Sequence, residues 1–164
     1  MKYLHVLYRS RPTHGEFDET DLDILKSALA FNSENGITGL LVRVDEQFYQ
    51  ALHGPKDAVS TLLAKIENDP RHTNMEILLS ESAAEVSPYG EWAMAYDSLI
   101  GFENDLGAAA DGNLPEITAE KARHILGLLA DLARGVAEFG SAFPYSRQFG
   151  ETDAAYMERL GGLA

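Results

Sequence analysis

The stretch that decides the fold is Ala30-Phe-Asn-Ser-Glu-Asn-Gly-Ile-Thr-Gly-Leu-Leu-Val-Arg-Val-Asp-Glu-Gln-Phe-Tyr-Gln-Ala-Leu-His-Gly-Pro55. Apolar residues recur at helical spacing over residues ~18–35, and Gly36 is a typical left-handed helix stop. Ile37–Val44 is rich in β-branched residues and Gln47–Leu52 alternates, so both are predicted strands joined by a two-residue turn. The stretch therefore predicts a helix followed by a β-hairpin.

Two primary amides in this stretch are predicted to point into the core. Asn32 lies on the apolar stripe of the helix, and Gln50 shares a strand face with Phe48 and Leu52. A buried amide without partners costs about 1–3 kcal/mol. Two amides aimed at one core therefore indicate a ligand with a donor-and-acceptor edge, such as a uracil-like ring. The alternative is that each amide bonds only to local backbone.

The rest of the chain completes an α+β pattern. The order βαββαββ matches the ferredoxin-like fold, with two helices on one face of a mainly antiparallel five-stranded sheet, and a C-terminal helical extension follows. Beyond the central stretch, the pattern predicts strands at residues 2–8, Met75–Leu79 and Trp92–Tyr96. It predicts helices from Pro55 to Asn68, from Thr118 to Phe139 and from Thr152 to Leu160. Loops are predicted at Arg11–Gly15 and Ser80–Gly90, and a linker at Gly107–Gly112.

The second face of the predicted sheet is too apolar to be left in water. It carries Tyr3, His5, Tyr49 and Ala51. We expect the Thr118–Phe139 helix, or a partner subunit, to cover this face. The alternative is that the helix packs only on the edge of the sheet.

Composition narrows the possible functions. The net charge of −13 and the pI of about 4.6 argue against nucleic acid as a partner, because binding it needs a basic surface. No apolar run approaches ~18 residues, so we expect no membrane span, and with no cysteine in the chain a cytoplasmic protein is the simplest interpretation. The chain has no cysteine, which excludes disulfides, thiolate metal sites and cysteine nucleophiles. No histidine pair has metal-ligand spacing, so we expect no metal.

Five segments between Tyr3 and Tyr96 form an ordered set of motifs. They are Leu7-Tyr8-Arg9-Ser10, Asn32 followed by Gly36-Ile37-Thr38-Gly39-Leu40-Leu41, Phe48-Tyr49-Gln50-Ala51-Leu52-His53-Gly54-Pro55, Asp69-Pro70-Arg71-His72, and Glu91-Trp92-Ala93-Met94. Together they are more specific than any one of them. With these segments in this order, residues from Tyr3 to Tyr96 closely resemble the BLUF family, the blue-light sensors that use flavin.

The resemblance implies a flavin-binding domain at residues 1–104 and a helical extension at residues 105–164. It implies a non-covalently bound flavin, usually FAD, with FMN and riboflavin left open, inserted between the two helices beside the sheet. Carried over by position, Tyr8 is the electron donor, Gln50 is the switching amide, and Asn32 holds the flavin's polar edge. Four further residues are implied to lie near the flavin: Lys65, Asp69, Arg71 and His72. Trp92 and Met94 are implied to lie on the signalling strand.

Two positions depart from the family pattern. His53 stands where relatives often carry glutamate, and Phe31 stands where many carry a polar or basic residue. Neither belongs to the set of Tyr8, Gln50 and Asn32, so these departures bear on cofactor affinity and recovery rate more than on cofactor presence.

The chemistry of these residues suits a light-driven switch that converts no substrate. Tyr8 is a neutral phenol that can give an electron and then a proton, and the Gln50 amide can present a new donor pattern after rotation or tautomerisation. Without cysteine, no flavin–cysteinyl adduct can form. We therefore expect a photoreceptor, not an enzyme, that signals through altered contacts with an unknown downstream protein and forms a homo-oligomer.

Other interpretations remain open at this point. Tyr8 could be only a core tyrosine, Arg71-His72 a helix-end pair that interacts with carbonyls, and the Trp92 and Met94 side chains plain packing. As a whole, the chain could instead be a flavin-dependent oxidoreductase or a flavin-free interaction module.

Overall fold

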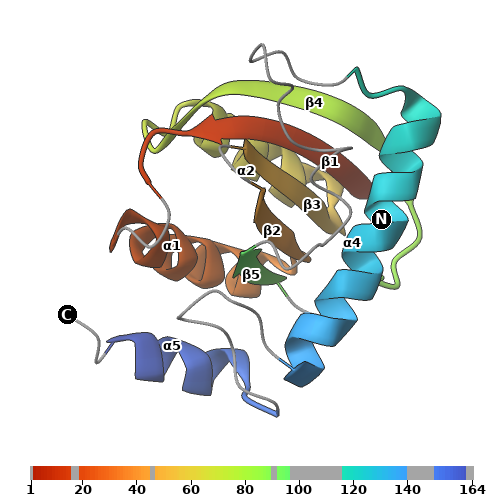
Figure 1. The fold of residues 1–164 in the computed structure, drawn as a ribbon. Coiled ribbons are helices and arrows are strands. Elements are labelled where there is room, and N and C mark those ends of the chain that lie inside the picture. Colours follow the sequence, from red (N-terminus) through yellow and green to blue (C-terminus); the bar gives the residue numbers. More distant parts are fainter. Residues whose placement is uncertain are drawn as a thin grey trace.

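The computed structural model describes residues 2–15, 19–44, 47–89, 92–96, 116–139 and 150–161 (Figure 1). Its element order confirms the predicted βαββαββ pattern and both C-terminal helices. The elements are β1 (Tyr3–Pro12), α1 (Glu19–Asn35), β2 (Thr38–Val44), β3 (Gln47–Pro55), α2 (Lys56–Glu67), β4 (His72–Ala83), β5 (Trp92–Tyr96), α4 (Ala119–Phe139) and α5 (Asp153–Gly161).

One five-stranded sheet organises the fold, with strand order β4-β1-β3-β2-β5. All neighbouring pairs are antiparallel except β2 and β5, which run parallel, so the mainly antiparallel sheet is confirmed. Helices α1 and α2 lie on one face (Figure 1). The strands β1 and β3 occupy the middle of the sheet and therefore contact a layer on each side.

Glycines set two local features of the central stretch. Gly36 has φ +68°, the left-handed conformation that ends α1, and the Ile37 N–H closes the turn on the Asn32 carbonyl at 3.0 Å. Gly39 has φ +154°, and a Cβ there would lie 2.0 Å from the Ala51 carbonyl oxygen. Only glycine allows β2 to approach β3 this closely.

Side-chain caps begin the two C-terminal helices. The Thr118 hydroxyl accepts a hydrogen bond from the Lys121 N–H at 3.1 Å, and the Thr152 hydroxyl accepts one from the Ala155 N–H at 3.1 Å. The predicted hairpin turn and the predicted Gly107–Gly112 linker lie outside the described residues.

Two strands are longer than predicted. β1 continues to Pro12 and β4 runs from His72 to Ala83, so the predicted loops at Arg11–Gly15 and Ser80–Gly90 are wrong in their first residues. The cause is pairing between the two strands, which spans all of β1 with register shifts. As an edge strand, β4 keeps polar side chains in water, so its composition carries little strand signal.

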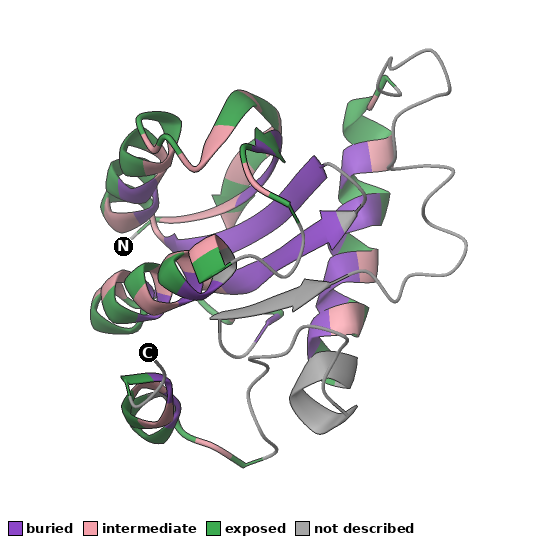
Figure 2. Ribbon diagram, turned by 60° about the vertical axis from the view of Figure 1, so that its left-hand side comes forward, coloured by how far each residue is buried: buried purple, intermediate pink, exposed green. Residues whose placement is uncertain are grey.

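The core has two layers, one on each face of the sheet. Val6, Leu25 and Leu52 lie in the layer between the sheet and the helices α1 and α2. Ala51 lies in the other layer, together with Leu129 of α4. The prediction that the Thr118–Phe139 helix covers the second face is therefore confirmed, and Figure 2 shows the central strands buried between exposed outer surfaces of the helices.

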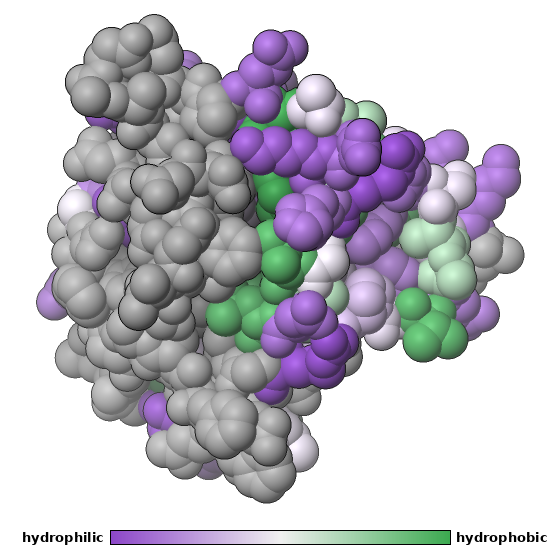
Figure 3. Space-filling model, turned by 45° about the vertical axis from the view of Figure 1, so that its right-hand side comes forward, coloured by the Kyte–Doolittle hydropathy of each residue, from purple (hydrophilic) through white to green (hydrophobic). Residues whose placement is uncertain are grey.

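One face of the described surface can be followed by its hydropathy. The described part of the face in Figure 3 exposes mainly hydrophilic residues around a few hydrophobic ones. The short helix α5 adds Tyr156 and Leu160 to the α1 side of the core, where both are 1% exposed.

Truncating the contact of α4 with the sheet tests this arrangement. We expect Leu129→Ala to lower the free energy of unfolding by about 2–5 kcal/mol, because Leu129 is 1% exposed and its loss leaves a cavity. His124→Ala, at an exposed position on the same helix, is the control. Urea unfolding measures both, and equal stability of the two variants would show that α4 does not cover the sheet.

Candidate functional site

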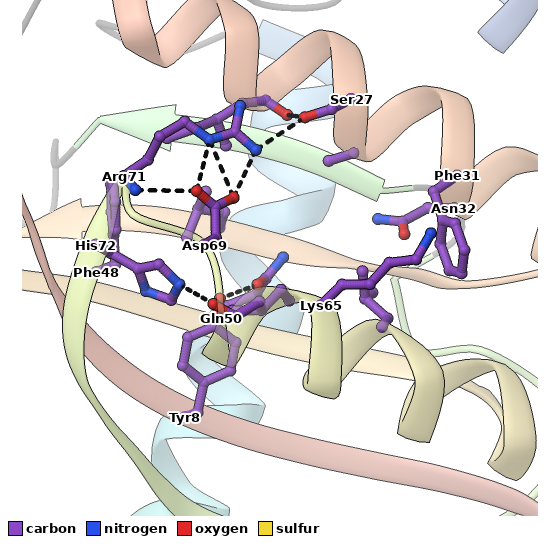
Figure 4. Close-up of a pocket in the computed structure, with 15 residues that line it drawn as sticks. Tyr8, Ser27, Phe31, Asn32, Phe48, Gln50, Lys65, Asp69, Arg71 and His72 are labelled. Atoms are coloured by element: carbon purple, nitrogen blue, oxygen red, sulfur yellow. Dashed lines mark hydrogen bonds and ion pairs between the residues drawn. The ribbon is translucent and has the colours of Figure 1, made fainter.

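Tyr8 and Gln50 meet across neighbouring strands. They are direct partners in the register of β1 and β3, each is 3% exposed, and the Tyr8 hydroxyl donates a hydrogen bond to Gln50 Oε1. Burial first, and then the charge of Asp69, raises the pKa of Tyr8 above its usual value of 10.0. The phenol is therefore neutral, and its proton already points at an acceptor (Figure 4).

A cavity of about 190 Å³ opens beside this pair, between the sheet and the helices α1 and α2. Sequence reasoning placed seven residues near a flavin, and the structure brings all seven to the wall of this cavity. They are Tyr8, Asn32, Gln50, Lys65, Asp69, Arg71 and His72. Trp92 and Met94 lie on β5, and their side chains are outside the described residues.

Among the described residues, the Asn32 side chain has no hydrogen-bond partner. It is 1% exposed, and both Nδ2 and Oδ1 are buried without a partner in the described part of the chain. The neighbouring Asn35 instead donates to the Phe31 carbonyl at 2.7 Å, so the local-backbone alternative describes Asn35 and is wrong for Asn32. Asn32 thus presents a donor and an acceptor on one planar group at the cavity, which fits the uracil-like edge of a flavin.

Asp69 and Arg71 form a clamp at the cavity rim. Arg71 Nε lies 2.9 Å from Asp69 Oδ1, Nη2 lies 2.6 Å from Oδ2, and the Arg71 backbone N–H also donates to Oδ1 at 2.9 Å. Arg71 Nη2 reaches across to the Ser27 hydroxyl of α1 at 3.2 Å. The clamp therefore ties the turn after α2 to α1, and Arg71 does not act as a helix-end residue.

The clamp keeps Asp69 ionised. Burial acts to raise the pKa of Asp69, but the hydrogen bonds and the charge of Arg71, with a contribution from His72, outweigh it and lower the pKa below 3.8. This fixed negative charge is one of the groups that hold Tyr8 as a neutral phenol.

Both ring nitrogens of His72 are bound to protein atoms. Nε2 lies 2.6 Å from the Ile66 carbonyl at the end of α2, and Nδ1 lies 2.6 Å from the Ser10 hydroxyl. A carbonyl only accepts, so Nε2 carries hydrogen. The helix-end alternative is thus confirmed for His72, whose ring also lies 6.3 Å from that of Tyr8, and His72 contributes packing to the site.

Lys65 and Phe31 face each other at the other end of the cavity. Lys65 Nζ lies 4.1 Å from the centre of the Phe31 ring, within cation–π range. Phe31, one of the two departures from the family pattern, is therefore a platform for a cation. No ion pair of Lys65 with a carboxylate occurs among the described residues, so its charge faces the cavity without a counter-ion.

Sequence reasoning missed two hydroxyls that support the site. Ser10 bonds to His72, and Ser27 bonds to Arg71. Strand alternation places Ser10 on the face of Tyr8, which is a signal for its position. The partner of Ser27 depends on how α1 packs beside the α2–β4 turn, and no local pattern encodes that contact.

Neither a metal cluster nor a membrane span is present in the described ranges. No group of three or more histidine, aspartate or glutamate side chains there could hold a metal ion. None of the helices described is long and apolar enough to cross a membrane.

Comparisons with known proteins agree on one family. The sequence model of the BLUF family, described as sensors of blue-light using FAD, matches residues 3–95. The beta subunit of a photoactivated adenylate cyclase from Euglena gracilis is 38% identical over 71 residues, which are 43% of this chain and 8% of that protein. The chain thus spans a small part of the curated relatives it matches.

Solved structures give the same result for the fold. The ground state of BlsA aligns with a TM-score of 0.63 and 27% identity, over 78% of this chain and 87% of that one. The dark state of BlrB, a BLUF protein, aligns with a TM-score of 0.54 and 21% identity over 97% and 94% of the two chains, and it supports the fold alone.

Replacing Asn32 by an apolar residue tests whether the amide is kept for a ligand. We expect Asn32→Leu to raise the stability of the flavin-free protein by about 1–3 kcal/mol, because an unpartnered buried amide is removed. Asn35→Leu loses a backbone hydrogen bond and should lower stability. Urea unfolding of both flavin-free variants gives the comparison, and destabilisation by Asn32→Leu would mean that the amide has a structural partner.

The clamp between Asp69 and Arg71 predicts that the effect of replacing Asp69 on stability depends on pH. We expect Asp69→Asn to cost about 1.5–3 kcal/mol near neutral pH, where the carboxylate accepts charged hydrogen bonds. Because the pKa of Asp69 is lowered on folding, its contribution is present above 3.8 and is lost as the pH falls through the folded value. The difference between native and variant stability should therefore shrink in acid, and a difference that does not change with pH would contradict the clamp.

Proposed function

The chain belongs to the BLUF family of blue-light sensors, and from that premise we propose that it senses blue light through a non-covalent flavin held between α1 and α2. The family's own cofactor makes FAD the first choice. The observation that carries the proposal is the buried hydrogen bond from Tyr8 to Gln50 at the wall of the cavity. We propose further that the chain is itself a sensor and not an enzyme.

The residues around the cavity suit a flavin. The Asn32 amide has a donor and an acceptor to offer to the polar edge of the ring system. Lys65 adds a cation where the phosphate part of FMN or FAD could reach it, and riboflavin lacks that phosphate. When bound, the flavin supplies an electron acceptor that blue light excites.

Tyr8 and Gln50 perform the switching step. Tyr8 is held as a neutral phenol, and it becomes a strong acid once it gives up an electron. Gln50 Oε1 already accepts the phenol hydrogen, so the proton has a prepared path to the amide. Rotation or tautomerisation of Gln50 then changes which donors and acceptors this side chain presents to the cavity.

The sheet offers a route from the switch to the surface strand. Gln50 of β3 pairs with Leu41 of β2, and Leu41 pairs with Met94 of β5, so these positions lie on one line across the sheet. A change at Gln50 reaches β5 through a single intervening strand. We propose that β5 and the helical extension at residues 105–164 pass the change to a downstream protein or to a second copy of the chain.

Spectroscopy of a phenol variant tests the proposal. We expect Tyr8→Phe to retain flavin but to lose the light-induced red shift, since the electron and proton donor is gone. Tyr3→Phe, on the same strand but the opposite face, is the matched control and should cycle normally. An unchanged red shift in Tyr8→Phe would remove Tyr8 from the mechanism.

A further inference from the structure

The connection from β4 to β5 crosses the sheet. The two strands lie at opposite edges, so the chain between them passes over β1, β3 and β2. We call residues Ala84–Tyr89 the strap. Tyr89 is 7% exposed and belongs to the core layer under α4, so the strap crosses on the α4 face, and β5 begins three residues later.

Side chains from three strands fasten the strap. His53 Nε2 of β3 lies 2.7 Å from the Ala84 carbonyl oxygen, and His5 Nε2 of β1 lies 2.5 Å from the Tyr89 hydroxyl. Between these ends, the hydroxyl of Thr38 on β2 is hydrogen-bonded to that of Ser87. The strap is thus held at its start, its middle and its end, and histidines hold both ends.

The two histidines form a pair across the sheet. His5 and His53 are direct partners in the β1–β3 register, and their ring centres lie 5.9 Å apart. His53 is 2% exposed, and its Nε2 must carry hydrogen because the Ala84 carbonyl only accepts. The pair is also enclosed by aromatic rings, since Tyr3 lies 5.6 Å from His53 and Tyr89 lies 5.4 Å from His5.

The surroundings of His5 favour its neutral form. Glu81 of β4 faces His5 across the sheet, but Arg123 of α4 lies 3.5 Å from that carboxylate and offsets its charge. Burial first, and then His53, lowers the pKa of His5 from 6.5, while Glu81 acts in the opposite direction. Burial raises the pKa of the Tyr89 phenol above its usual range, so this phenol adds no charge to the cluster.

We propose that His53 and His5 are positioning residues that hold the strap, and through it β5, to the strand of Gln50, and that protonation of His5 releases the strap. His53 follows Gln50 by three residues on β3, while the strap leads directly into β5. A charge on His5 would form inside a half-buried cluster, 5.9 Å from the His53 ring, so the fastening weakens as the His5 ring gains a proton. His53 is also one of the two positions at which the sequence departs from the family pattern.

The sign of the pH effect follows from the lowered pKa of His5. The folded protein binds this proton less readily than the unfolded chain, whose value is near 6.5. The fastening is complete above that value and is lost as the pH falls through the lower folded value. The strap is therefore fastened to the sheet at neutral pH and loosened in mild acid.

Amide hydrogen exchange of the strap in the dark tests the proposal without any photocycle. Rates at about pH 7.5 and about pH 5 are corrected for the intrinsic exchange at each pH. In the native protein we expect the protection factors of the strap amides to fall about tenfold in acid. A change of this size corresponds to the loss of one ordinary hydrogen bond. The double variant His5→Gln/His53→Gln keeps amide donors that do not titrate, so its protection should not change with pH.

Two single variants complete the design. His53→Leu cannot donate to the Ala84 carbonyl, and we expect it to lose strap protection already at neutral pH, while His53→Gln restores it. His124→Gln, at an exposed histidine on α4, should behave like the native protein. Equal pH responses of the native protein and the double variant, or native protection in His53→Leu, would overturn the proposal.

The link to light rests on the proposed function and has its own readout. In His53→Leu we expect the flavin red shift to persist, because Tyr8 and Gln50 are untouched, while light-induced exchange changes in β5 disappear. Undiminished exchange changes in β5 of this variant would contradict the coupling. A native protein without any red shift would instead refute the proposed function, and the dark experiment would still decide the role of the two histidines.

Discussion

The hydrogen bond between Tyr8 and Gln50 is the contact on which the rest of the structure depends. It requires β1 and β3 to be neighbours in one register, because a shift by one residue would turn either side chain to the α4 face. Both strands are covered on both faces, which fixes this register through the apolar residues beside the pair. Gly39 contributes from the other side, since it lets β2 lie close against β3.

The cavity beside this contact holds a buried amide that departs from the usual pairing of buried polar groups. A buried amide is normally paired, yet both polar atoms of Asn32 have no partner in the described part of the chain. Around it, Asp69, Arg71 and His72 are bound to protein groups, so they shape and charge the cavity without being open ligands themselves. Local departures of this kind are expected where a protein binds something else.

Much of the fold was predictable from sequence because its signals are local. The helix stop at Gly36, the alternation around Gln50 and the apolar stripe of α4 each follow from a few neighbouring residues. The extent of β4 was not predictable, since an edge strand with polar side chains shows no alternation until its partner is known.

The candidate site was also predictable only in part. The residue types of Tyr8, Gln50 and Asn32 and their faces could be predicted, and the resemblance supplied their roles. The separate uses of Arg71 and His72 could not be predicted, because they depend on Ser27 of α1 and on the end of α2. His53 likewise looked like a substitution within a motif until its contact with Ala84 was seen.

Because the phenol and the amide share a proton beside the cavity, illumination should change hydrogen bonding and leave the cofactor oxidised at the end. The most direct measurement is the absorption spectrum of the flavin-loaded native protein before blue illumination, during it and after return to the dark. We expect a small red shift of the flavin bands that reverses in the dark. Bleaching that does not reverse, or no change at all, would contradict a switch built on Tyr8 and Gln50.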